Sequence, residues 1–455
     1  MHPAYISKTT SYWGDCQPEI AMSSFRQFKP TGNLTPYTEA PYVNAGFLSP
    51  YFNETHHALR AEVRQFVQEY ITPFVDEWDE AGEIDPNLYL EFGKRGYLAA
   101  LTGQHKYPVE YTDVRIKSVP PEKFDFFHES IITEEISRSG SGGVVWFLMG
   151  GYNISVPAIF NYASEEIKSR ILPDILCGKK RSCLAITEPD AGSDVANLTT
   201  TATKQGDHYV VEGTKKWITN GIFSDFFVTA VRTGGPGATG VSMILIERNE
   251  DVSTSKILTQ GMRGSGTTLV NFEDVKVPVG NLLYKENHGF KCIVTNFNHE
   301  RLMIIYQAIG MCRVLLEDSF KWCYQRETFG EKLINHAVIR AKIGVMASKV
   351  DALQAYANDL SAQYTWMNPK QAQVALGGPI ALCKANASQT LEYCAREATQ
   401  IFGGLGYTRG GKGGRVEQIY REVRAYAIPG GSEEIMIDLG VRQAVKYASS
   451  LGAKL

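Results

Sequence analysis

Residues 183–220 restrict the possible folds of this chain more than any other stretch. Short runs rich in Thr, Val and aromatic residues are separated there by Gly206-Asp207 and Glu212-Gly213, a pattern typical of β-hairpins. The segment CLAITEPDAGSD opens the stretch, and Trp217 lies near its end. We therefore expect a β region that holds a loop of small residues against a Trp ring, a surface suited to a flat ring system.

The composition indicates a globular protein without a strong charge. With 455 residues, 44% of them hydrophobic, the chain can bury a large core in two or three domains. The 46 basic and 49 acidic residues leave a net charge of −3, so we expect neither nucleic acid nor an acidic membrane as the main partner. The eight cysteines form no Cys-x-x-Cys pair, which indicates reduced thiols and no metal site.

Two stretches could be mistaken for membrane or targeting segments. Residues 142–160 form the one long apolar run, but Asn153, Pro157 and paired glycines favour a buried helix over a membrane span. The first residues lack the pattern of a secretory signal or of a mitochondrial transit peptide. We expect a chain without a membrane span.

Hydrophobic periodicity divides the chain into four parts, and the predicted fold class is α+β. The expected parts are an N-terminal extension over 1–48, an all-α domain over 49–180, a β-barrel-like domain over 181–285 and a four-helix bundle over 286–455. Within them, the spacing predicts strands over 226–231, 241–246 and 269–277 and long helices over 290–324, 337–366, 371–402 and 432–449.

Three motifs with other meanings can be set aside. Residues 406–412 match the phosphate-loop pattern G-x-x-x-x-G-K, but Gly413 replaces the required Ser or Thr and a helix precedes the motif. No G-x-G-x-x-G follows a predicted strand, so a dinucleotide fold is not indicated. His299-Glu300 lacks the second His of a zinc helix, because Met303 stands at that position.

The segments CLAITEPDAGSD and WITNG closely resemble the flavin signature of the acyl-CoA dehydrogenase family, and the resemblance extends over roughly residues 50–450. It implies one non-covalently bound FAD per chain. In this family the positions of Ile186, Thr187, Trp217 and Thr219 line the flavin ring, with the hydroxyls of Thr187 and Ser193 as candidate donors. Ser193 also matches a position that contacts acyl-CoA.

The ordinary alternative for this region is a Gly/Ser turn packed on a buried Trp. The predicted cofactor residues of this region are Leu184, Ile186, Thr187, Gly192, Ser193, Trp217 and Thr219.

Two later segments extend the resemblance to the rest of the cofactor. Residues 326–330 resemble the family's R-x-T-F-G, which reaches across a dimer interface to the flavin pyrophosphate, and Arg suits phosphate oxygens. Residues 400–406 resemble its Q-I-x-G-G-x-G stretch, where glycines admit the adenosine half of the neighbouring subunit's cofactor. A surface ion pair and a helix C-cap are the ordinary alternatives. The implied cofactor residues are Arg326, Thr328, Phe329, Gln400, Gly403 and Gly404.

The segment IPGGSEEIM, residues 428–436, opens the last predicted helix, with Ser432 as N-cap and acidic residues at the positive end of the helix dipole. The resemblance implies that this turn faces the flavin and the thioester. Many relatives carry the catalytic Glu at the position of Gly430, but a minority, including the long-chain and isovaleryl types, place it before an Arg on another helix. FNHERL, residues 297–302, matches that minority. The implied residues are Glu300 as base, Ser432 and Glu434 for the cofactor, and Asn298, Arg301, Pro429, Gly430 and Gly431 for the substrate.

The resemblance implies dehydrogenation of an acyl-CoA thioester to a trans-2-enoyl-CoA, as in fatty acid β-oxidation, with an electron-transferring flavoprotein or oxygen as acceptor. Two alternatives stay open. One is an oxidase on the same scaffold, acting on an acyl-CoA or a nitroalkane-type carbon acid, and the other is an inactive flavoprotein that only binds acyl-CoA. For Glu300 itself, the ordinary structural alternative is an ion pair with a nearby Arg. The resemblance also implies a homotetramer, a dimer of dimers. The ending Ala453-Lys454-Leu455 resembles a peroxisomal address, which predicts a peroxisomal protein in a eukaryote and a cytoplasmic one otherwise.

Overall fold

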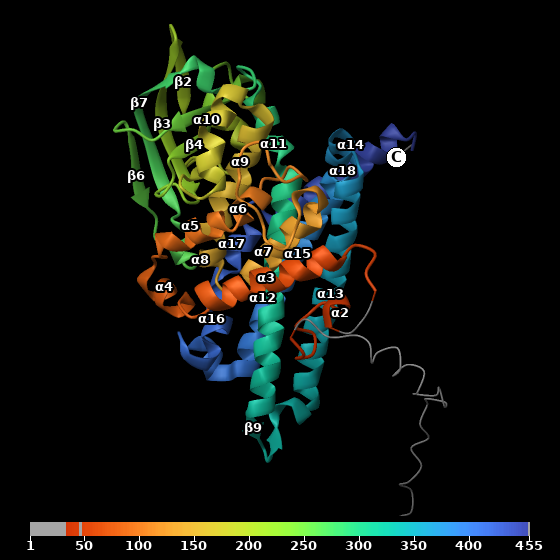
Figure 1. Cartoon of the computed structure of the whole chain (residues 1–455). Helices are drawn as coiled ribbons and strands as arrows, with labels where there is room; N and C mark the ends of the chain where they lie inside the picture. Colours follow the sequence, from red (N-terminus) through yellow and green to blue (C-terminus); the bar gives the residue numbers. More distant parts are fainter. Residues whose placement is uncertain (1–32, 45–47, 454–455) are drawn as a thin grey trace, which may run out of the picture.

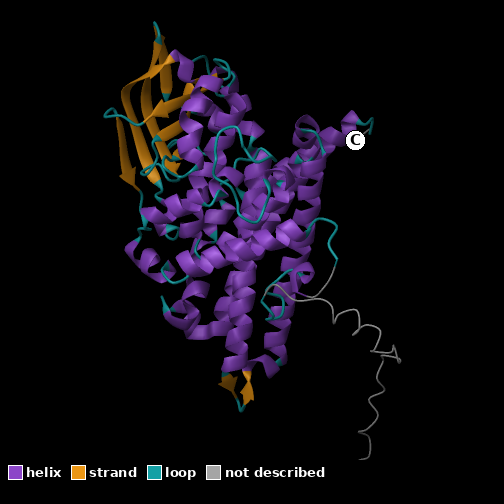
Figure 2. Ribbon diagram, viewed as in Figure 1, coloured by secondary structure: helices purple, strands orange, loops and turns teal. Residues whose placement is uncertain are grey.

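The computed structural model describes residues 33–44 and 48–453, and it places a β region between two helical regions of the chain (Figures 1 and 2). This order confirms the predicted α+β fold class. The N-terminal helices are α2 (Pro41–Asn44), α3 (Glu54–Tyr70), α4 (Val75–Ala81), α5 (Pro86–Lys94), α6 (Tyr97–Ala100), α7 (Phe126–Ser137), α8 (Gly142–Val145), α9 (Gly151–Tyr162) and α10 (Glu165–Leu176).

Two capping boxes fix the starts of α3 and α7. Asn53 caps α3 and Asp125 caps α7, and in each case the third helical residue, His56 or His128, accepts the N–H of its cap residue. The two imidazole rings stack with centroids 3.9 Å apart. The side chain of Asp125 lies 2.9 Å from a ring nitrogen of each His, so one carboxylate joins the two helix starts.

The long apolar run is a core segment, as its sequence predicts. It forms α8, the π-helical turn η2 (Trp146–Gly150) and α9. Residues 142–162 are the one stretch of the described chain that is long and apolar enough to cross a membrane, and 83% of its most apolar window is buried within the protein. The π turn inserts an extra residue between α8 and α9, a feature that is frequent at functional sites.

One sheet forms most of the β region. Its order is β6-β7-β3-β2-β4-β5-β8, with β1 paired to β4 in parallel, and the ladder from β6 to β8 does not close within the described strands. The three strands predicted from the sequence lie in β4, β5 and β7. The strands are β1 (Ser182–Ala185), β2 (Thr201–Gln205), β3 (His208–Ile218), β4 (Phe226–Arg232), β5 (Val241–Glu247), β6 (Val252–Lys256), β7 (Thr268–Pro278) and β8 (Leu282–Leu283).

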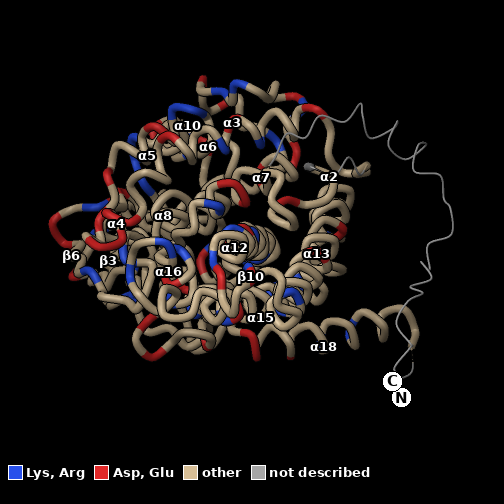
Figure 3. The backbone as a smooth tube through the Cα atoms, turned by 90° about the horizontal axis from the view of Figure 1, so that it is seen from below, with Lys and Arg blue, Asp and Glu red and all other residues tan. Residues whose placement is uncertain are grey.

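The C-terminal region is built on four long helices that pack against one another: α12 (Phe297–Gln325), α13 (Ala337–Trp366), α15 (Gly377–Phe402) and α18 (Glu433–Ser450). Shorter elements connect them: α11 (Gly289–Thr295), the hairpin β9 (Glu327–Thr328) and β10 (Glu331–Lys332), α14 (Pro369–Ala375), α16 (Gly414–Glu422) and α17 (Arg424–Ala427). Figure 3 shows acidic and basic residues interspersed along this part of the chain.

Two predicted helices are each divided in the structure. The helix expected over 290–324 is interrupted at Asn296, whose side chain donates to the carbonyl of Asn153 and contacts the ring of His299 instead of facing solvent. The helix expected over 371–402 is interrupted at Leu376, before two glycines and Pro379, which has no N–H to donate. In both places local side-chain or backbone chemistry overrides the apolar periodicity.

The described part of the predicted N-terminal extension lies against the helices. Three arginines bind it: Arg64 pairs with Glu39 at 2.6 Å, and Arg138 and Arg313 donate to backbone carbonyls at 2.7 and 2.9 Å. The carbonyls belong to Thr38 and Tyr37. Arg64 lies on α3, Arg138 is the C-cap of α7 and Arg313 lies on α12. Residues 1–32 of the extension lie outside the described residues.

One buried carboxylate joins all three regions. Glu422, at the end of α16, accepts a hydrogen bond of 2.7 Å from the N–H of Gly142 in α8 and one of 3.1 Å from the N–H of Met262. Met262 precedes β7 in a left-handed conformation, φ +56°. Because buried N–H groups need an acceptor, this carboxylate fixes how the helices meet the sheet.

We expect Glu422→Ala to lower the free energy of unfolding by about 2 kcal/mol or more, because it leaves two backbone N–H groups without an acceptor. Chemical denaturation measures the loss. Glu417→Ala on the same helix is the control, since its partner Arg421 keeps Asp79 as a second partner, and we expect it to cost about 1 kcal/mol or less. Equal losses in the two variants would contradict the joining role of Glu422.

Candidate functional site

A buried ion pair shapes the small-residue loop that follows β1. Lys215, fully buried on β3, places its Nζ 2.7 Å from Glu188 Oε1 and donates to the carbonyl of Ile186 at 2.9 Å. Glu188 also accepts the N–H groups of Thr199 and Thr200 at 2.6 and 2.9 Å. The carboxylate therefore closes the loop of residues 188–200 at its base.

Burial alone raises the pKa of the Glu188 carboxyl, but the Lys215 ammonium and the hydrogen bonds from the loop lower it to about 2. A carboxyl whose folded pKa lies below its ordinary value stabilises the protein at neutral pH, and this stability is lost as the pH falls from about 4.5 towards 2. At neutral pH the ionised Glu188 carboxylate therefore stabilises the loop.

The Trp at the end of β3 is exposed rather than buried, which contradicts the ordinary alternative of a turn packed on a core Trp. Trp217 is 51% exposed, and its φ of +67° lies in the left-handed region, which costs free energy for a side chain other than Gly. The ammonium of Lys216 covers part of it, 4.7 Å from the ring centroid. The fold thus holds a large aromatic surface at the edge of the sheet, available to a flat ligand.

Of the loop residues predicted from the signature, Thr187 contacts the end of β3 that carries this Trp. Ile186 is nearly buried, and Thr187 donates its hydroxyl to the carbonyl of Lys216 at 2.5 Å. The hydroxyl of Thr187 is thus directed at the backbone of β3, and its role as a donor to a bound ring stays a prediction. Leu184 is half-buried in β1, and Gly192 and Ser193 are exposed.

Asn220 connects the Trp217 loop to the other two regions. Its Oδ1 accepts the N–H of Gly151 at 2.9 Å, and its Nδ2 donates to the carbonyl of Trp146 at 3.0 Å. Trp146 in turn donates its Nε1 to Gln307 of α12 at 3.2 Å. Next to Asn220, the methyl group of Thr219 lies so close to Gly150 that a Cβ there would come within 2.9 Å of it.

The start of α12 and the turn before α18 face each other. A Cβ added at Gly430 would lie 3.8 Å from Glu300 Oε1, and Arg301 donates its Nε to the carbonyl of Gly430 at 3.1 Å. Glu300 therefore places its carboxylate beside the position at which a side chain on residue 430 would begin. The family resemblance predicted that residues 300 and 430 serve one site, and the distance between them agrees with this.

The Glu300 carboxylate is half-buried and has no hydrogen-bond donor among the described residues. No Lys, Arg or His nitrogen of the described chain lies within 4 Å of it, so the alternative of an ion pair with Arg301 does not hold. Burial raises the pKa of Glu300 to about 7, although Arg301 and Lys384 act in the opposite direction. Such a carboxyl can both accept and release a proton near neutral pH.

The turn at residues 429–431 depends on glycine. Gly430 and Gly431 have φ values of +67° and +96°, conformations that side chains rarely adopt. Within the described part of the chain, the N–H of Gly430 has no protein acceptor. Pro429 has no N–H at all. The turn thus presents one free N–H group beside the Glu300 carboxylate, a donor for an oxygen that gains negative charge.

The other predicted residues of this area have ordinary structural contacts as well. Asn298 is buried and donates to the carbonyl of Ala372 at 3.4 Å. Ser432 is the N-cap of α18, as predicted, and its Oγ accepts the N–H of Ile435 at 3.5 Å. Glu434 is exposed in the first turn of α18.

The hairpin β9–β10 lies at the far end of α12 from the sheet (Figure 1). Arg326 is exposed, Phe329 at the tip is 98% exposed, and Thr328 contacts His336 at 3.0 Å. A single chain therefore does not bring these three predicted cofactor residues to Trp217 or to Glu300.

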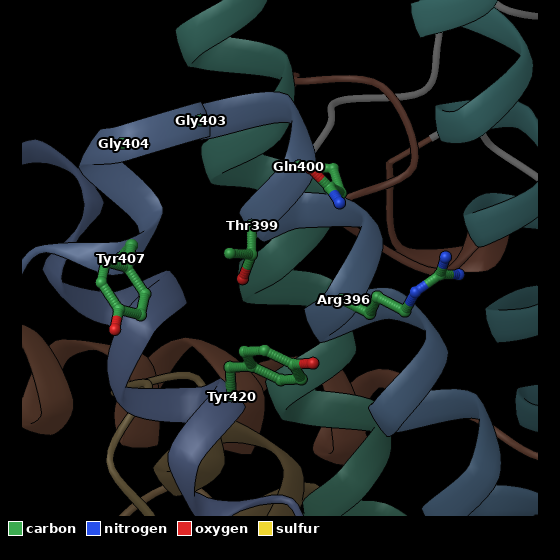
Figure 4. A pocket seen from close by; sticks show the side chains of 7 residues that line it. All are labelled: Arg396, Thr399, Gln400, Gly403, Gly404, Tyr407 and Tyr420. Carbon is green, nitrogen blue, oxygen red and sulfur yellow. The ribbon is translucent and has the colours of Figure 1, made fainter.

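A hollow of about 300 Å³ lies where α15 ends (Figure 4). Its lining includes the predicted Gln400, Gly403 and Gly404, and also Arg396, Thr399, Tyr407 and Tyr420. A Cβ at Gly403 or at Gly404 would meet no atom within 4 Å. The hollow is thus open on the glycine side, where another backbone or a ligand could approach closely.

Reading of the sequence missed Lys215 and Lys384, although each carries a local signal. Strand alternation puts Lys215 on the same side of β3 as the buried Tyr209 and Val211. Helical spacing puts Lys384 in the apolar stripe that includes Ile380 and Leu391. A Lys in a buried stripe indicates a charged group with an internal partner.

The comparisons with known proteins agree on one family. Models of the acyl-CoA dehydrogenase N-terminal, middle and C-terminal domains match residues 53–179, 183–275 and 287–445. The chain is 40% identical to acyl-CoA dehydrogenase apdG of Emericella nidulans, over 92% of this chain and 97% of the relative. It is 28% identical to the mitochondrial long-chain specific acyl-CoA dehydrogenase of Rattus norvegicus, over 87% of each chain. The crystal structure of a probable acyl-CoA dehydrogenase from Mycobacterium abscessus matches with a TM-score of 0.78 and 35% identity, over 87% of this chain and all of that chain.

We expect Lys215→Met to destabilise the protein by about 3 kcal/mol or more, because Glu188 is then a buried charge without its cationic partner. The loss should appear in chemical denaturation and in the amount of flavin that copurifies. Lys204→Met, an exposed Lys on the neighbouring strand β2, is the matched control and should change neither quantity. An unfolding midpoint of Lys215→Met equal to that of the parent would contradict the role of the pair.

Proposed function

Because this chain belongs to the acyl-CoA dehydrogenase family, FAD-dependent oxidoreductases that act on acyl-CoA, we propose that it converts an acyl-CoA to a trans-2-enoyl-CoA with Glu300 as the base. One observation carries the assignment of the base: the Glu300 carboxylate lies beside Gly430, the position at which many relatives place their catalytic Glu. The resemblance to the long-chain type, which has Gly at that position, supports the same choice.

The residues present suit FAD. The exposed, left-handed Trp217 offers an aromatic face, and Ile186, Gly192 and Thr219 belong to the segments that follow β1 and β3. With the Thr187 hydroxyl directed at the backbone of β3, backbone N–H groups of the loop and the Ser193 hydroxyl are further donors for ring carbonyls. We propose that Arg326 and the open hollow at Gln400 hold the pyrophosphate and adenosine parts of the cofactor of a neighbouring subunit.

The proposed reaction begins at the α carbon of the thioester. Glu300 takes the α proton, and the electron pair of the broken C–H bond moves towards the thioester carbonyl. The free N–H of Gly430 donates to that oxygen as its negative charge grows. Bound FAD supplies the acceptor for the hydride that leaves the β carbon, and a trans double bond remains between the α and β carbons.

Glu300 is poised for this role by its surroundings. It must be ionised to accept a proton, so its activity rises with pH through its pKa of about 7. We further propose that an electron-transferring flavoprotein removes the electrons from the reduced enzyme. Steady formation of hydrogen peroxide with acyl-CoA under air would identify oxygen as the acceptor instead and favour an oxidase.

Glu300→Gln tests the base directly. The substitution keeps the shape of the side chain but cannot accept the proton, so flavin reduction by acyl-CoA should fall by at least about a hundredfold while binding persists. Stopped-flow absorbance of the flavin, recorded with acyl-CoA substrates of different acyl-chain length, measures both the rate of flavin reduction and substrate binding. Reduction of the variant at the parent rate would overturn the assignment.

Restoring a carboxylate at residue 430 is a sharper test of the shared site. The double variant Glu300→Gln, Gly430→Glu should regain part of the rate, but the left-handed φ of Gly430 and the Cδ1 of Ile304, 2.6 Å from the new Cβ, oppose the new side chain. Adding Ile304→Val removes that Cδ1, so the triple variant should recover more than the double variant. No recovery in either would contradict a shared site.

We propose that the protein is a homotetramer, a dimer of dimers. Two surfaces support this: the hairpin β9–β10 extends away from the body (Figure 1), with Phe329 exposed between its strands, and α18 exposes several apolar side chains. These are Ile435, Ile437, Val441, Val445 and Tyr447. Light scattering should give about four times the chain mass of 50.5 kDa, and the mass of a monomer would contradict the proposal.

We also propose a peroxisomal location in a eukaryotic source, or a cytoplasmic one otherwise. Of the ending that motivates it, Lys454 and Leu455 lie outside the described residues. The last helix, α18, ends at Ser450, three residues before this tripeptide. A fluorescent fusion that keeps this ending is the direct test, and a diffuse signal that deletion of Leu455 leaves unchanged would remove the proposal.

A further inference from the structure

Lys384 is a fully buried lysine at the centre of the candidate active site. It lies on α15, and its Nζ donates to the carbonyls of Gly431 at 2.7 Å and of Ala427 at 3.2 Å. No carboxylate oxygen of the described chain lies within 4 Å of this nitrogen. Burying an ammonium group is costly, and here it is directed at backbone carbonyls rather than at an ion-pair partner.

The two carbonyls belong to the turn that carries Gly430. Together with Arg301, which takes the carbonyl of Gly430 itself, cationic side chains hold three carbonyls of residues 427–431. Because Gly430 and Gly431 could adopt many conformations, these hydrogen bonds select the left-handed one that is observed. In that conformation the N–H of Gly430 points to no protein acceptor among the described residues.

Lys384 also lies beside Glu300. A Cβ at Gly430 would be 3.8 Å from Glu300 Oε1 and 3.9 Å from Lys384 Cε, so both side chains border the same point. Burial raises the pKa of Glu300, and three neighbours oppose this effect: Arg301 and His299 on α12 and, to a smaller extent, the ammonium of Lys384. The charged groups that act on Lys384 itself are Glu433, Arg301, Glu300 and Glu434, and burial lowers its pKa to about 8.

We propose that Lys384 is a positioning residue for removal of the α proton. It holds the Gly430 turn so that the free N–H meets the thioester carbonyl, and its charge favours the ionised form of Glu300. This role rests on the proposed function. No bond to substrate forms or breaks at Lys384, and the α proton passes to Glu300.

A purely structural role for Lys384, as a link from α15 to the start of α18, has a matched control. One turn further along α15, Ser388 donates its Oγ to Glu433 in the first turn of α18 at 2.6 Å. Ser388→Ala removes that link without touching a carbonyl of the Gly430 turn. A residue that only ties the two helices together should therefore behave like Ser388 when it is replaced.

The experiment follows the α proton alone in the FAD-loaded enzyme. The probe is a 3-thiaacyl-CoA, which has an α proton but carries sulfur in place of the β carbon, so it has no hydride to transfer. Nuclear magnetic resonance measures exchange of its α proton into heavy water as a function of pH for the parent, Lys384→Met, Lys384→Gln and Ser388→Ala. Glu300→Gln is included as the test of the base.

We expect exchange at neutral pH to fall by about tenfold or more in Lys384→Met, because the Gly430 turn loses two of its three cationic hydrogen bonds and no longer holds the free N–H towards the thioester oxygen. The pH at which exchange reaches half its maximum should rise, because Glu300 loses the cation that favours its charged form. Lys384→Gln keeps a donor for one carbonyl but no charge, so it should show the same rise in pH with a smaller loss of maximal rate. Ser388→Ala should match the parent.

A pH profile of Lys384→Met or Lys384→Gln that coincides with the parent profile would overturn the inference. So would an equal loss in Ser388→Ala, since that result points to helix packing alone. Failure of the proposed function gives a different result: Glu300→Gln would then exchange the α proton at the parent rate, whatever the lysine variants do. The inference and the proposed function are thus tested separately.

Discussion

Charged side chains that satisfy buried backbone groups are the interaction on which this structure depends. A buried N–H or C=O group without a partner costs free energy, and the places where separate regions of a chain meet contain many such groups. Here Glu422 accepts the N–H of Gly142 in α8 and that of Met262 between β6 and β7, Lys215 and Glu188 close the loop that follows β1, and Lys384 holds the turn before α18. Each of these residues fixes a backbone conformation that the surrounding apolar packing alone leaves free.

Two buried carboxylates show that a raised pKa does not by itself identify a base. Burial raises the pKa of both Glu300 and Glu422 to about 7. Both oxygens of Glu422 accept backbone N–H groups, so this side chain is engaged in holding the fold together. Glu300 accepts no hydrogen bond from the described residues and lies beside a turn with a free N–H. The hydrogen-bond partners of each carboxylate, rather than its raised pKa, distinguish the structural Glu422 from the candidate base Glu300.

The sequence predicted the order of helices and strands well because apolar periodicity is a local property. It failed where a local polar interaction changes the chain direction, as at Asn296, whose side chain binds the carbonyl of Asn153. It also left open whether Trp217 is buried and whether Glu300 forms an ion pair. The left-handed backbone at the end of β3 decides the exposure of Trp217, and the distance between Glu300 and the nearest basic side chains decides the ion pair. Neither property is visible in the residue pattern.

The sequence by itself determined which chemistry is available: a Glu before an Arg in FNHERL, two glycines in place of a carboxylate at residues 430–431, and the small-residue loop before Trp217. Only the tertiary structure decided that the first two of these, the Glu-Arg pair and the glycine turn, lie together. Arg301 and Gly430 are separated by 129 residues. The packing of α12, α15 and α18 brings the start of α12 and the turn before α18 into hydrogen-bond contact. It also gives Lys384 its position, because the partners of a buried lysine depend on which backbone carbonyls the folded chain brings near it.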